Sequence, residues 1–366
     1  MYSIGLDVHA AMTAVCVLDP HGKRVREFVL RGPLAEAVAA VEKLHHELGP
    51  LRICYEASTA AGWLFDHLQG PGRKVLVAHP GKVRLIFRAK RKNDRIDARK
   101  LATLCFLDQV PQAHIPSPER RQWRSLIEYR RRLVEKRAAA KSRLRTLLRT
   151  HAIAAPRGLW TKKGQEWLTQ QDLGPCQSLQ RDQLMQELHE TRQKIVQTEA
   201  VLKKTAAQEP SVALLRTIPG VGIRTAEAVV AYIDEPRRFR RVKSVGCYFG
   251  LVPCEDTSVK SRLGHITKEG PSTVRKYLTE ATWQAVRRSP TIRARYERIR
   301  REDPKRSRLA LIATAHYLLR VMLAMLQTGE EWNPEYSPNP SQESLKNERR
   351  NRRNRPSATP AAPRAA

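Results

Sequence analysis

The sequence predicts an α/β domain at the N-terminus, followed by a helical coiled-coil region and a mostly α-helical C-terminal domain. The first hundred residues alternate strand-like and helix-like patterns, which is typical of an α/β domain. A long helical pattern begins at Pro118, and a second helix after it carries apolar residues at coiled-coil spacing. The chain has 366 residues, which is enough for two or three domains, because a single core rarely grows to that size.

The α/β domain is predicted to contain five strands and two helices. In order, these are strands at residues 3–7, 14–18 and 24–30, a helix at 33–48, a strand at 52–55, a helix that ends at Leu68 and a strand at 74–77. Gly49-Pro50 ends the first helix, and Ser58 or Thr59 is expected to cap the second. The first three strands are expected to form a β-meander. This order of elements is that of the RNase H-like fold.

Two long helices are predicted after the α/β domain. The first covers residues 118–151 and is strongly basic, and the second covers residues 179–206. Side chains of the second keep a 4-3-4-3-4 spacing, which is typical of a coiled-coil seam, at Leu184, Leu188, Thr191, Ile195, Thr198 and Leu202. We therefore expect the two helices to pair, within the chain or between protomers. The intervening residues 152–175 are rich in glycine and read as a connector.

A helix-hairpin-helix motif is predicted at residues 214–233, LLRTIPGVGIRTAEAVVAYI. In such a motif Gly220 and Gly222 bring backbone N–H groups close to a phosphate, at the N-terminus of the second helix. The alternative is an ordinary αα-hairpin with glycine in its turn. The resulting domains are 1–115 for the α/β domain, 116–209 for the coiled-coil and linker region, 210–330 for the C-terminal domain and 331–366 for a disordered basic tail.

The composition indicates a nucleic-acid partner. Lysine and arginine number 67 against 36 acidic residues, a net charge of +31, and 41% of the chain is hydrophobic. The apolar fraction excludes a wholly disordered chain, and so large an excess of positive charge favours a polyanion, because phosphate backbones release counterions when they bind Lys and Arg. The six cysteines show no zinc or disulfide spacing. With no signal-peptide pattern and no uninterrupted membrane-spanning segment, we expect a cytoplasmic, nucleoid-associated protein.

Four carboxylates in this basic background are candidate metal ligands. Asp7 and Glu56 end two predicted strands, and Asp94 and Asp97 are spaced to share one face of a helix. In an RNase H-like sheet these two strands are neighbours, so a helix across their ends would gather all four groups. Crowded carboxylates repel one another and favour a divalent cation such as Mg²⁺, and two such ions can promote phosphoryl transfer. Each residue alone could instead cap a turn, form an ion pair or begin a helix.

Several motifs resemble one family. GLDVH, YEAS and KNDRIDARKLA, followed by a basic helix, resemble the DEDD catalytic domain of the insertion sequence 110 family of transposases, which is related to the Piv/MooV DNA invertases. IPGVG, RRFRRVKSVGCYFGLVPCEDTS and RLGHITKEGPSTVRKYLTEATWQAV resemble the C-terminal transposase domain of that family, so the resemblance runs from Met1 to about Gln327. It implies that Asp7, Glu56, Asp94 and Asp97 are the metal-binding tetrad of a RuvC-like domain.

The resemblance also implies a nucleophilic serine. Family members carry it in a Ser-Gly step after the GLVP turn, and Ser258 is the match in EDTSVKSRLGHITKEG. Val259 stands where glycine is usual, which leaves Ser261 as the alternative. A serine that attacks a phosphodiester forms a phosphoserine bond, which conserves the energy of the broken strand for rejoining.

Phosphate contacts are expected from basic residues near these motifs and from the glycine-rich turn. The candidates are Lys92, Arg95, Gly220, Gly222, Arg240, Arg262 and Lys268.

The predicted activity is that of a DNA transposase or site-specific recombinase that uses Ser258 and a Mg²⁺ site. The resemblance implies donor and target DNA and a guide noncoding RNA as partners. It also implies a homo-oligomer, in which dimers join into a tetramer and the serine domain of one protomer completes the metal site of another. Two alternatives remain: a RuvC-like junction endonuclease that uses metal-activated water, and a noncatalytic nucleic-acid-binding protein with structural carboxylates.

Overall fold

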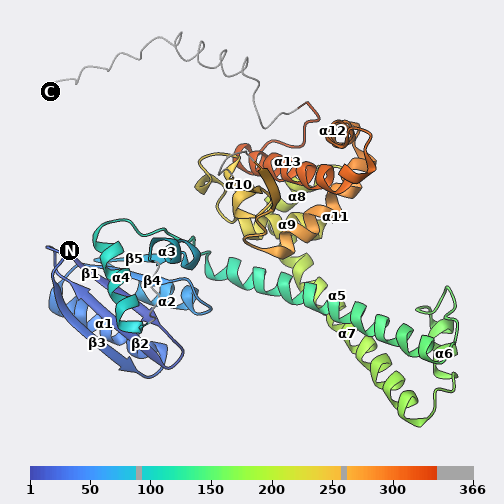
Figure 1. Ribbon diagram of the computed structural model, residues 1–366, viewed down its shortest axis with the longest axis horizontal. Helices are drawn as coiled ribbons and strands as arrows, with labels where there is room; N and C mark the ends of the chain where they lie inside the picture. The colour runs from blue at the N-terminus through green and yellow to red at the C-terminus, as the bar shows by residue number, and fades with distance from the viewer. Residues whose placement is uncertain (88–92, 257–261, 336–366) are drawn as a thin grey trace, which may run out of the picture. The chain divides into compact units, whose positions relative to one another are not determined.

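The protein consists of two compact units, Met1–Arg121 and Gln122–Ala366 (Figure 1). The computed structural model describes residues 1–87, 93–256 and 262–335. The first unit is a mixed α/β sheet domain and the second is mostly helical, as predicted. Lys92, Ser258, Ser261 and nearly all of the predicted basic tail lie outside the described residues, so their predictions rest on the sequence alone.

A five-stranded mixed sheet with the order β3-β2-β1-β4-β5 forms the centre of the first unit. Strands β1 (Tyr2–Val8), β2 (Met12–Leu18) and β3 (Arg24–Arg31) form the predicted antiparallel meander. Strand β4 (Leu51–Glu56) pairs parallel with β1, and β5 (Arg73–Ala78) pairs parallel with β4. Strand β1 therefore occupies the middle of the sheet, with β4 as its direct neighbour.

Helices cover both faces of this sheet. Successive side chains of a strand point to opposite faces, so each strand contributes side chains to two separate cores. Helices α1 (Leu34–Leu48) and α2 (Ala61–Leu68) pack against one face, where the core includes Ile4, Leu6, Ile53 and Tyr55. Helix α4 (Asp94–Phe106) packs against the other face, where the core includes Ala14, Cys16, Cys54, Ala98 and Leu101. A short helix, α3 (Pro80–Ile86), follows β5. Gly5 of β1 and Cys54 of β4 therefore face α4, and so do the residues two positions after them, Asp7 and Glu56.

Two local predictions were wrong. The N-cap of α2 is Ala60, with no side-chain cap hydrogen bond, rather than Ser58 or Thr59. The stretch between the long helices is not a plain connector, because it contains α6 (Lys162–Thr169). Thr161 caps α6 by accepting a hydrogen bond from the backbone N–H of Gly164, and Leu159 and Leu168 are buried against the long helices. The glycine content concealed this small core, since Gly164 lies where only a residue without a side chain fits against Gly158 and Leu159.

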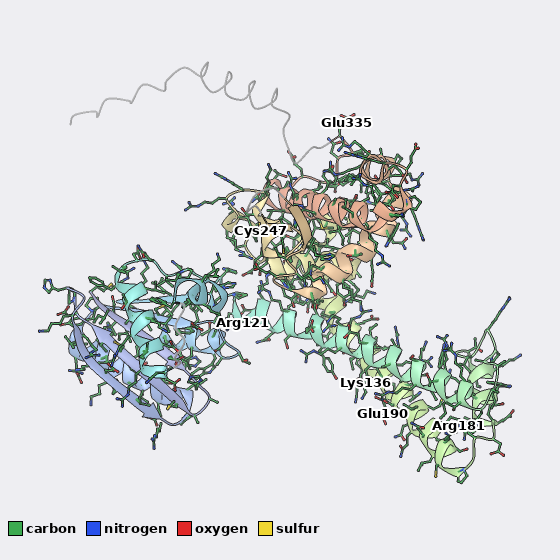
Figure 2. The ribbon with its side chains drawn as sticks, viewed as in Figure 1. Arg121, Lys136, Arg181, Glu190, Cys247 and Glu335 are labelled. Carbon is green, nitrogen blue, oxygen red and sulfur yellow. The ribbon has the colours of Figure 1, made fainter. Side chains whose placement is uncertain are left out.

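The two predicted long helices are present as α5 (Pro118–Thr150) and α7 (Pro175–Ala207), and they pair within the chain (Figures 1 and 2). All six predicted seam residues of α7 are buried. Ion pairs also join the two helices, from Arg130 to Glu199 at 2.5 Å and from Lys136 to Glu187 at 3.1 Å. The apolar seam of α7 is therefore buried against α5 of the same chain.

The remaining helices of the second unit enclose one large hydrophobic core. They are α8 (Pro210–Arg216), α9 (Ile223–Ile233), α10 (Ser244–Tyr248), α11 (Ser272–Arg288), α12 (Pro290–Arg300) and α13 (Ser307–Thr328). Helices α8 and α9 and the turn between them follow the predicted helix, turn, helix pattern. A two-stranded antiparallel sheet of β6 (Pro253–Asp256) and β7 (Arg262–Ile266) was not predicted.

One helical stretch has the length and composition of a membrane span. It is Pro304–Thr328, with a mean hydropathy of 1.8, and 72% of that window is buried inside the protein. Its residues, among them Leu318, Val321 and Met322, belong to the core of the helical unit. The apolar character of α13 is thus explained by packing.

The cysteines divide between the two units by exposure. All six are free thiols. Cys16, Cys54 and Cys105 are buried in the first unit, whereas Cys176, Cys247 and Cys254 are exposed in the second. Burial raises the pKa of Cys105 to about 11 and that of Cys54 still further.

Candidate active site

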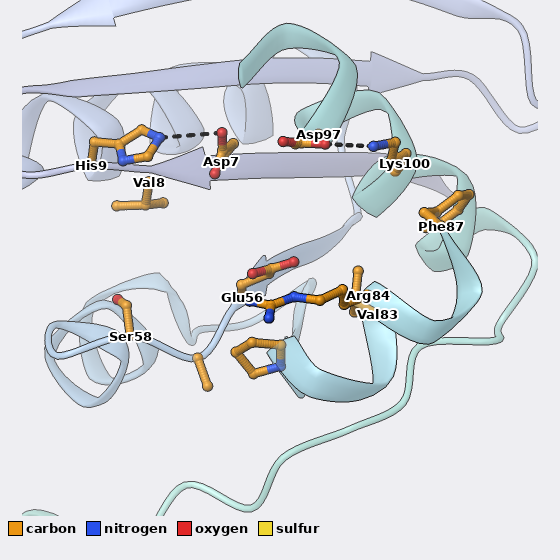
Figure 3. Close-up of a pocket in the computed structure, with 12 residues that line it drawn as sticks. Asp7, Val8, His9, Glu56, Ser58, Val83, Arg84, Phe87, Asp97 and Lys100 are labelled. Atoms are coloured by element: carbon orange, nitrogen blue, oxygen red, sulfur yellow. Dashed lines mark hydrogen bonds and ion pairs between the residues drawn. The ribbon is translucent and has the colours of Figure 1, made fainter. Parts of the chain in front are cut away.

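A cleft of about 500 Å³ opens where β1 and β4 end (Figure 3). Three of the four predicted carboxylates, those of Asp7, Glu56 and Asp97, line it. Arg84 and Lys100 line it as well, so the cleft contains both signs of charge. Figure 3 shows Glu56 across the cleft from Asp7 and Asp97.

The register of the sheet places Asp7 and Glu56 at the same edge. Strands β1 and β4 are parallel, and Leu6 is paired with Tyr55, so Asp7 and Glu56 each follow the last paired position. Because Leu6 and Tyr55 pack against α1 and α2, the next residue of each strand points to the opposite face, toward α4. Strand alternation and parallel pairing thus bring two carboxylates together that are far apart in the sequence.

Helix α4 supplies the other two carboxylates from its first turn. Its N-cap is Asn93, whose side chain accepts a hydrogen bond from the backbone N–H of Arg95 at 3.0 Å. Asp94 and Asp97 follow, three residues apart, and so lie on one face of the helix. Carboxylates are also favourable there, because the N-terminus of a helix carries a partial positive charge.

Asp7, His9 and Asp94 form a cluster of potential metal ligands. One ligand atom from each lies within 4.8 Å of the others. His9 Nε2 is 3.4 Å from Asp7 Oδ2 and 3.5 Å from Asp94 Oδ1. Burial raises the pKa of Asp7, His9 opposes that shift, and the charges of Asp94 and Asp97 add to it. The site therefore holds Asp7 in surroundings that disfavour its negative charge unless a cation is near.

The buried oxygen of Asp7 points to a cation. Asp7 Oδ2 is inaccessible and forms no hydrogen bond within the part of the chain that the structure describes. His9 Nε2, 3.4 Å away, is an ion-pair partner of this oxygen but donates no hydrogen bond to it. A buried acceptor that receives no hydrogen bond is costly, and hard divalent cations prefer carboxylate oxygens. The residues present thus fit a divalent metal, held by Asp7 and Asp94 with Glu56 and Asp97 within the same cleft.

Three cleft residues were missed in the sequence prediction. His9 follows Asp7 by two positions, which is the strand spacing for a shared face. Lys100 follows Asp97 by three, which is the helix spacing, and its Nζ lies 2.6 Å from Asp97 Oδ1. Arg84 comes from α3, an element that was not predicted. Spacing could have identified the first two, whereas Arg84 required the position of α3.

The predicted phosphate-contact residues that the structure describes come from several different elements. Arg95, Arg240 and Lys268 are exposed, and Arg262 begins β7. Gly220 has a φ of +91°, and a β-carbon there would stand 2.4 Å from the backbone nitrogen of Ala285 in α11. Its lack of a side chain is therefore required for packing against α11. Gly222 is the N-cap of α9 and has open space around it.

Comparison with known families decides what kind of protein carries this cleft. Residues 4–153 match a family model of DEDD transposases of IS110 elements, described as "Transposase". Residues 212–297 match a second model, described as "Transposase IS116/IS110/IS902 family". The chain belongs to this family of transposases. Members cleave and transfer DNA strands, and their DEDD domain uses a divalent metal.

Curated relatives from bacteria agree with this assignment. The transposase for insertion sequence element IS1328 of Yersinia enterocolitica is 26% identical, over 63% of this chain and 70% of the relative. The transposase for insertion sequence element IS1111A of Coxiella burnetii is 27% identical, over 75% of each chain. A probable family 20 transposase of Pseudomonas aeruginosa is 25% identical, over 78% of this chain and 84% of the relative. The similarity to these transposases thus spans most of both chains.

Proposed function

We propose that this transposase cuts and rejoins DNA through a phosphoserine intermediate on Ser258, with Mg²⁺ held by Asp7, Glu56, Asp94 and Asp97. The observation that carries the metal part is the convergence of carboxylates from β1, β4 and α4 on one cleft, where a buried oxygen of Asp7 accepts no hydrogen bond. The serine part rests on the match of the segment around Ser258 to the family motif. Bound Mg²⁺ supplies positive charge that stabilises the oxygens of the reacting phosphate.

The residues of the chain have separable roles in this proposal. Ser258 Oγ loses its proton to solvent and attacks the phosphorus, and the bond from phosphorus to the departing sugar oxygen breaks as the phosphoserine bond forms. The departing oxygen takes up a proton from solvent and becomes a sugar hydroxyl. Rejoining reverses these changes with a different sugar hydroxyl, so no energy source is required. Arg262 and Lys268 follow Ser258 in the sequence and are proposed to offset the negative charge of the phosphate. His9 and Lys100 limit repulsion among the carboxylates before DNA enters.

The partners beyond DNA belong to the same proposal. We propose a guide noncoding RNA, transcribed from the ends of the element, that pairs with donor and target DNA. We also propose a homo-oligomer in which Ser258 of one protomer acts at the carboxylates of another. The charge of +31 supports a protein that holds several nucleic-acid segments at once.

The deciding experiment looks for a covalent protein–DNA adduct. The full chain is incubated with Mg²⁺, the noncoding RNA of the element and a plasmid that carries the ends of the element. We expect a protease-sensitive adduct that is lost in Ser258→Ala and kept in Ser261→Ala. Loss only in Ser261→Ala would move the nucleophile to that residue.

Two other outcomes would overturn the proposal. Clean cutting without an adduct would identify a water-using, RuvC-like endonuclease. Unchanged binding and no cutting by either wild type or Asp7→Asn would identify a nucleic-acid-binding protein with structural carboxylates. Asp172→Asn serves as the matched control, because Asp172 is exposed and accepts a hydrogen bond from the backbone N–H of Gly174, distant in sequence from the cleft elements.

A further inference from the structure

We propose that a cluster of four cations around Trp160 binds the phosphate backbone of a nucleic acid. The cluster, called here the α6 cation cluster, consists of Arg137, Lys141, Arg145 and Arg192. Three of them come from α5 and one from α7, and Trp160 lies just before α6. The proposal concerns binding by the helical unit and does not depend on the serine mechanism.

The charge pattern along α5 changes abruptly after Lys136. From Arg130 to Lys136 the cations are matched: Arg130 pairs with Glu199, Arg131 with Glu128 and Glu135, Arg132 with Glu128, and Lys136 with Glu187. From residue 137 to the end of α5, the sequence RAAAKSRLRTLLRT contains five cations and no carboxylate. Figure 2 shows Lys136, Glu190 and Arg181 along this helix pair. The cations of the matched part are explained by ion pairs within α5 and with α7, whereas those of the unmatched part are not.

The three α5 members of the cluster share one face of the helix. Arg137, Lys141 and Arg145 are spaced four residues apart, so their side chains lie one above another. Trp160 fixes two of them, because Lys141 Nζ is 4.8 Å and Arg145 Cζ is 5.4 Å from the centroid of its ring. The tryptophan is itself held, since it packs against the buried core beside α6 and its carbonyl accepts a hydrogen bond from Gln165.

Helix α7 adds the fourth cation to the same place. The guanidinium of Arg192 donates a hydrogen bond to Gln165 Oε1 at 3.4 Å, which turns it toward α6. Partial burial lowers the pKa of Lys141, and the charges of Arg192, Arg137 and Arg145 lower it further. Lys141 is thus close enough to the other three cations to be repelled by each of them.

No described carboxylate relieves this repulsion. Of the nearby acids, Glu187 pairs with Lys136, Asp182 pairs with Arg181, and Glu190 accepts a hydrogen bond from Gln186. Glu166 of α6 is exposed. Fixed cations that repel one another bind a polyanion favourably, because the ligand removes the repulsion and releases its counterions. The geometry therefore fits consecutive phosphates of a DNA or RNA backbone.

The first test measures salt-dependent binding of the full chain by fluorescence anisotropy. The probes are a short duplex DNA and the RNA duplex of the same sequence, between about 50 and 200 mM salt. Lys141→Gln/Arg192→Gln is expected to weaken binding by about tenfold and to reduce the slope of log K against log salt by about two. Loss with only one probe assigns the cluster to that nucleic acid.

A matched control removes equal charge from the same helix pair. Arg132→Gln/Lys136→Gln takes two cations from sites that carry carboxylate partners. We expect it to change the slope much less. An equal change in both double variants, or no change in either, would overturn the proposal.

A second measurement uses the wild-type chain and so does not depend on the folding of a variant. The wild-type chain is treated with an amine-acetylating reagent with and without each duplex, and modification is read by mass spectrometry. We expect the duplex to protect Lys141 several-fold and to leave Lys136 unchanged. Equal labelling of Lys141 with and without both duplexes would contradict the proposal.

Discussion

Gly5 of β1 lies so close to α4 that a β-carbon on it would stand 2.0 Å from the carbonyl oxygen of Ala98. It would also stand 2.4 Å from the backbone nitrogen of Ala102. Both contacts are with helix backbone, which cannot turn aside as a flexible side chain can. Glycine in the strand and alanine in the helix therefore allow the approach that brings Asp94 and Asp97 beside Asp7.

Substitution of Gly5 tests this relationship. Gly5→Ala is expected to destabilise the first unit by about 1–3 kcal/mol, because it forces α4 away from the sheet. Hydrogen exchange should become faster in β1 and α4, and divalent metal should bind more weakly. Gly222→Ala is the control, because Gly222 has an ordinary φ of −86° and open space where the methyl would lie. Unchanged exchange in Gly5→Ala would show that the close approach is not required.

Loss of the Asp7 charge should weaken metal binding. In Asp7→Asn the buried oxygen becomes a neutral amide ligand, so affinity for Mn²⁺, used as a spectroscopic probe for Mg²⁺, is expected to fall at least about tenfold. Strand cleavage should fall to background with it. Calorimetry and electron paramagnetic resonance measure the binding, and Asp172→Asn should behave as wild type. Equal Mn²⁺ affinity in Asp7→Asn would remove Asp7 from the ligand set.

Lys100 should oppose metal binding, because its ammonium group pairs with the Asp97 carboxylate and so competes with a metal ion for that ligand. The Lys100 Nζ to Asp97 Oδ1 distance is 2.6 Å, and neither side chain is fully exposed. Lys100→Met is expected to tighten Mn²⁺ binding about threefold, which matches the modest worth of such a pair. Lys43→Met, on the exposed surface of α1, should leave the affinity unchanged. Weaker Mn²⁺ binding in Lys100→Met would instead show that Lys100 supports the site.

The pH dependence of stability should reveal Glu227, which is buried in α9 beside Arg224. Burial raises its pKa from 4.5 to about 7, although Arg224 and Arg130 oppose the shift. Between pH 4.5 and about pH 7 the folded state then binds more protons than the unfolded state, so the free energy of unfolding falls as pH rises through that range. The fall should be at most about 3 kcal/mol.

A matched pair of variants isolates this effect. Glu227→Gln should flatten the pH dependence of urea unfolding, followed by tryptophan fluorescence, between about pH 4.5 and pH 7. Glu297→Gln is the control. Glu297 also pairs with an arginine three residues away, Arg300, but at an exposed site, so this variant should keep the pH dependence of the wild type. Equal pH profiles in Glu227→Gln and wild type would show that Glu227 is ionised in the folded protein throughout.

Local patterns were sufficient to predict most of the fold. Alternation in β1 to β5 and the glycine-proline stop after α1 are encoded within a few residues each, and the seam of α7 repeats over about five turns. Asp7 and Glu56 were predictable because strand order alone places their strand ends together. Arg84 and the core around α6 were not, since both depend on contacts between segments that have no periodic signature.

The distribution of thiols has a practical consequence for labelling experiments. A maleimide dye should react with Cys176, Cys247 and Cys254 and spare the three thiols buried among β-strands and α4. Every label then reports on the helical unit alone. Cys254 lies four residues before Ser258, so once Cys176 and Cys247 are replaced by serine, energy transfer from a dye on Cys254 to labelled DNA would follow the approach of the serine segment.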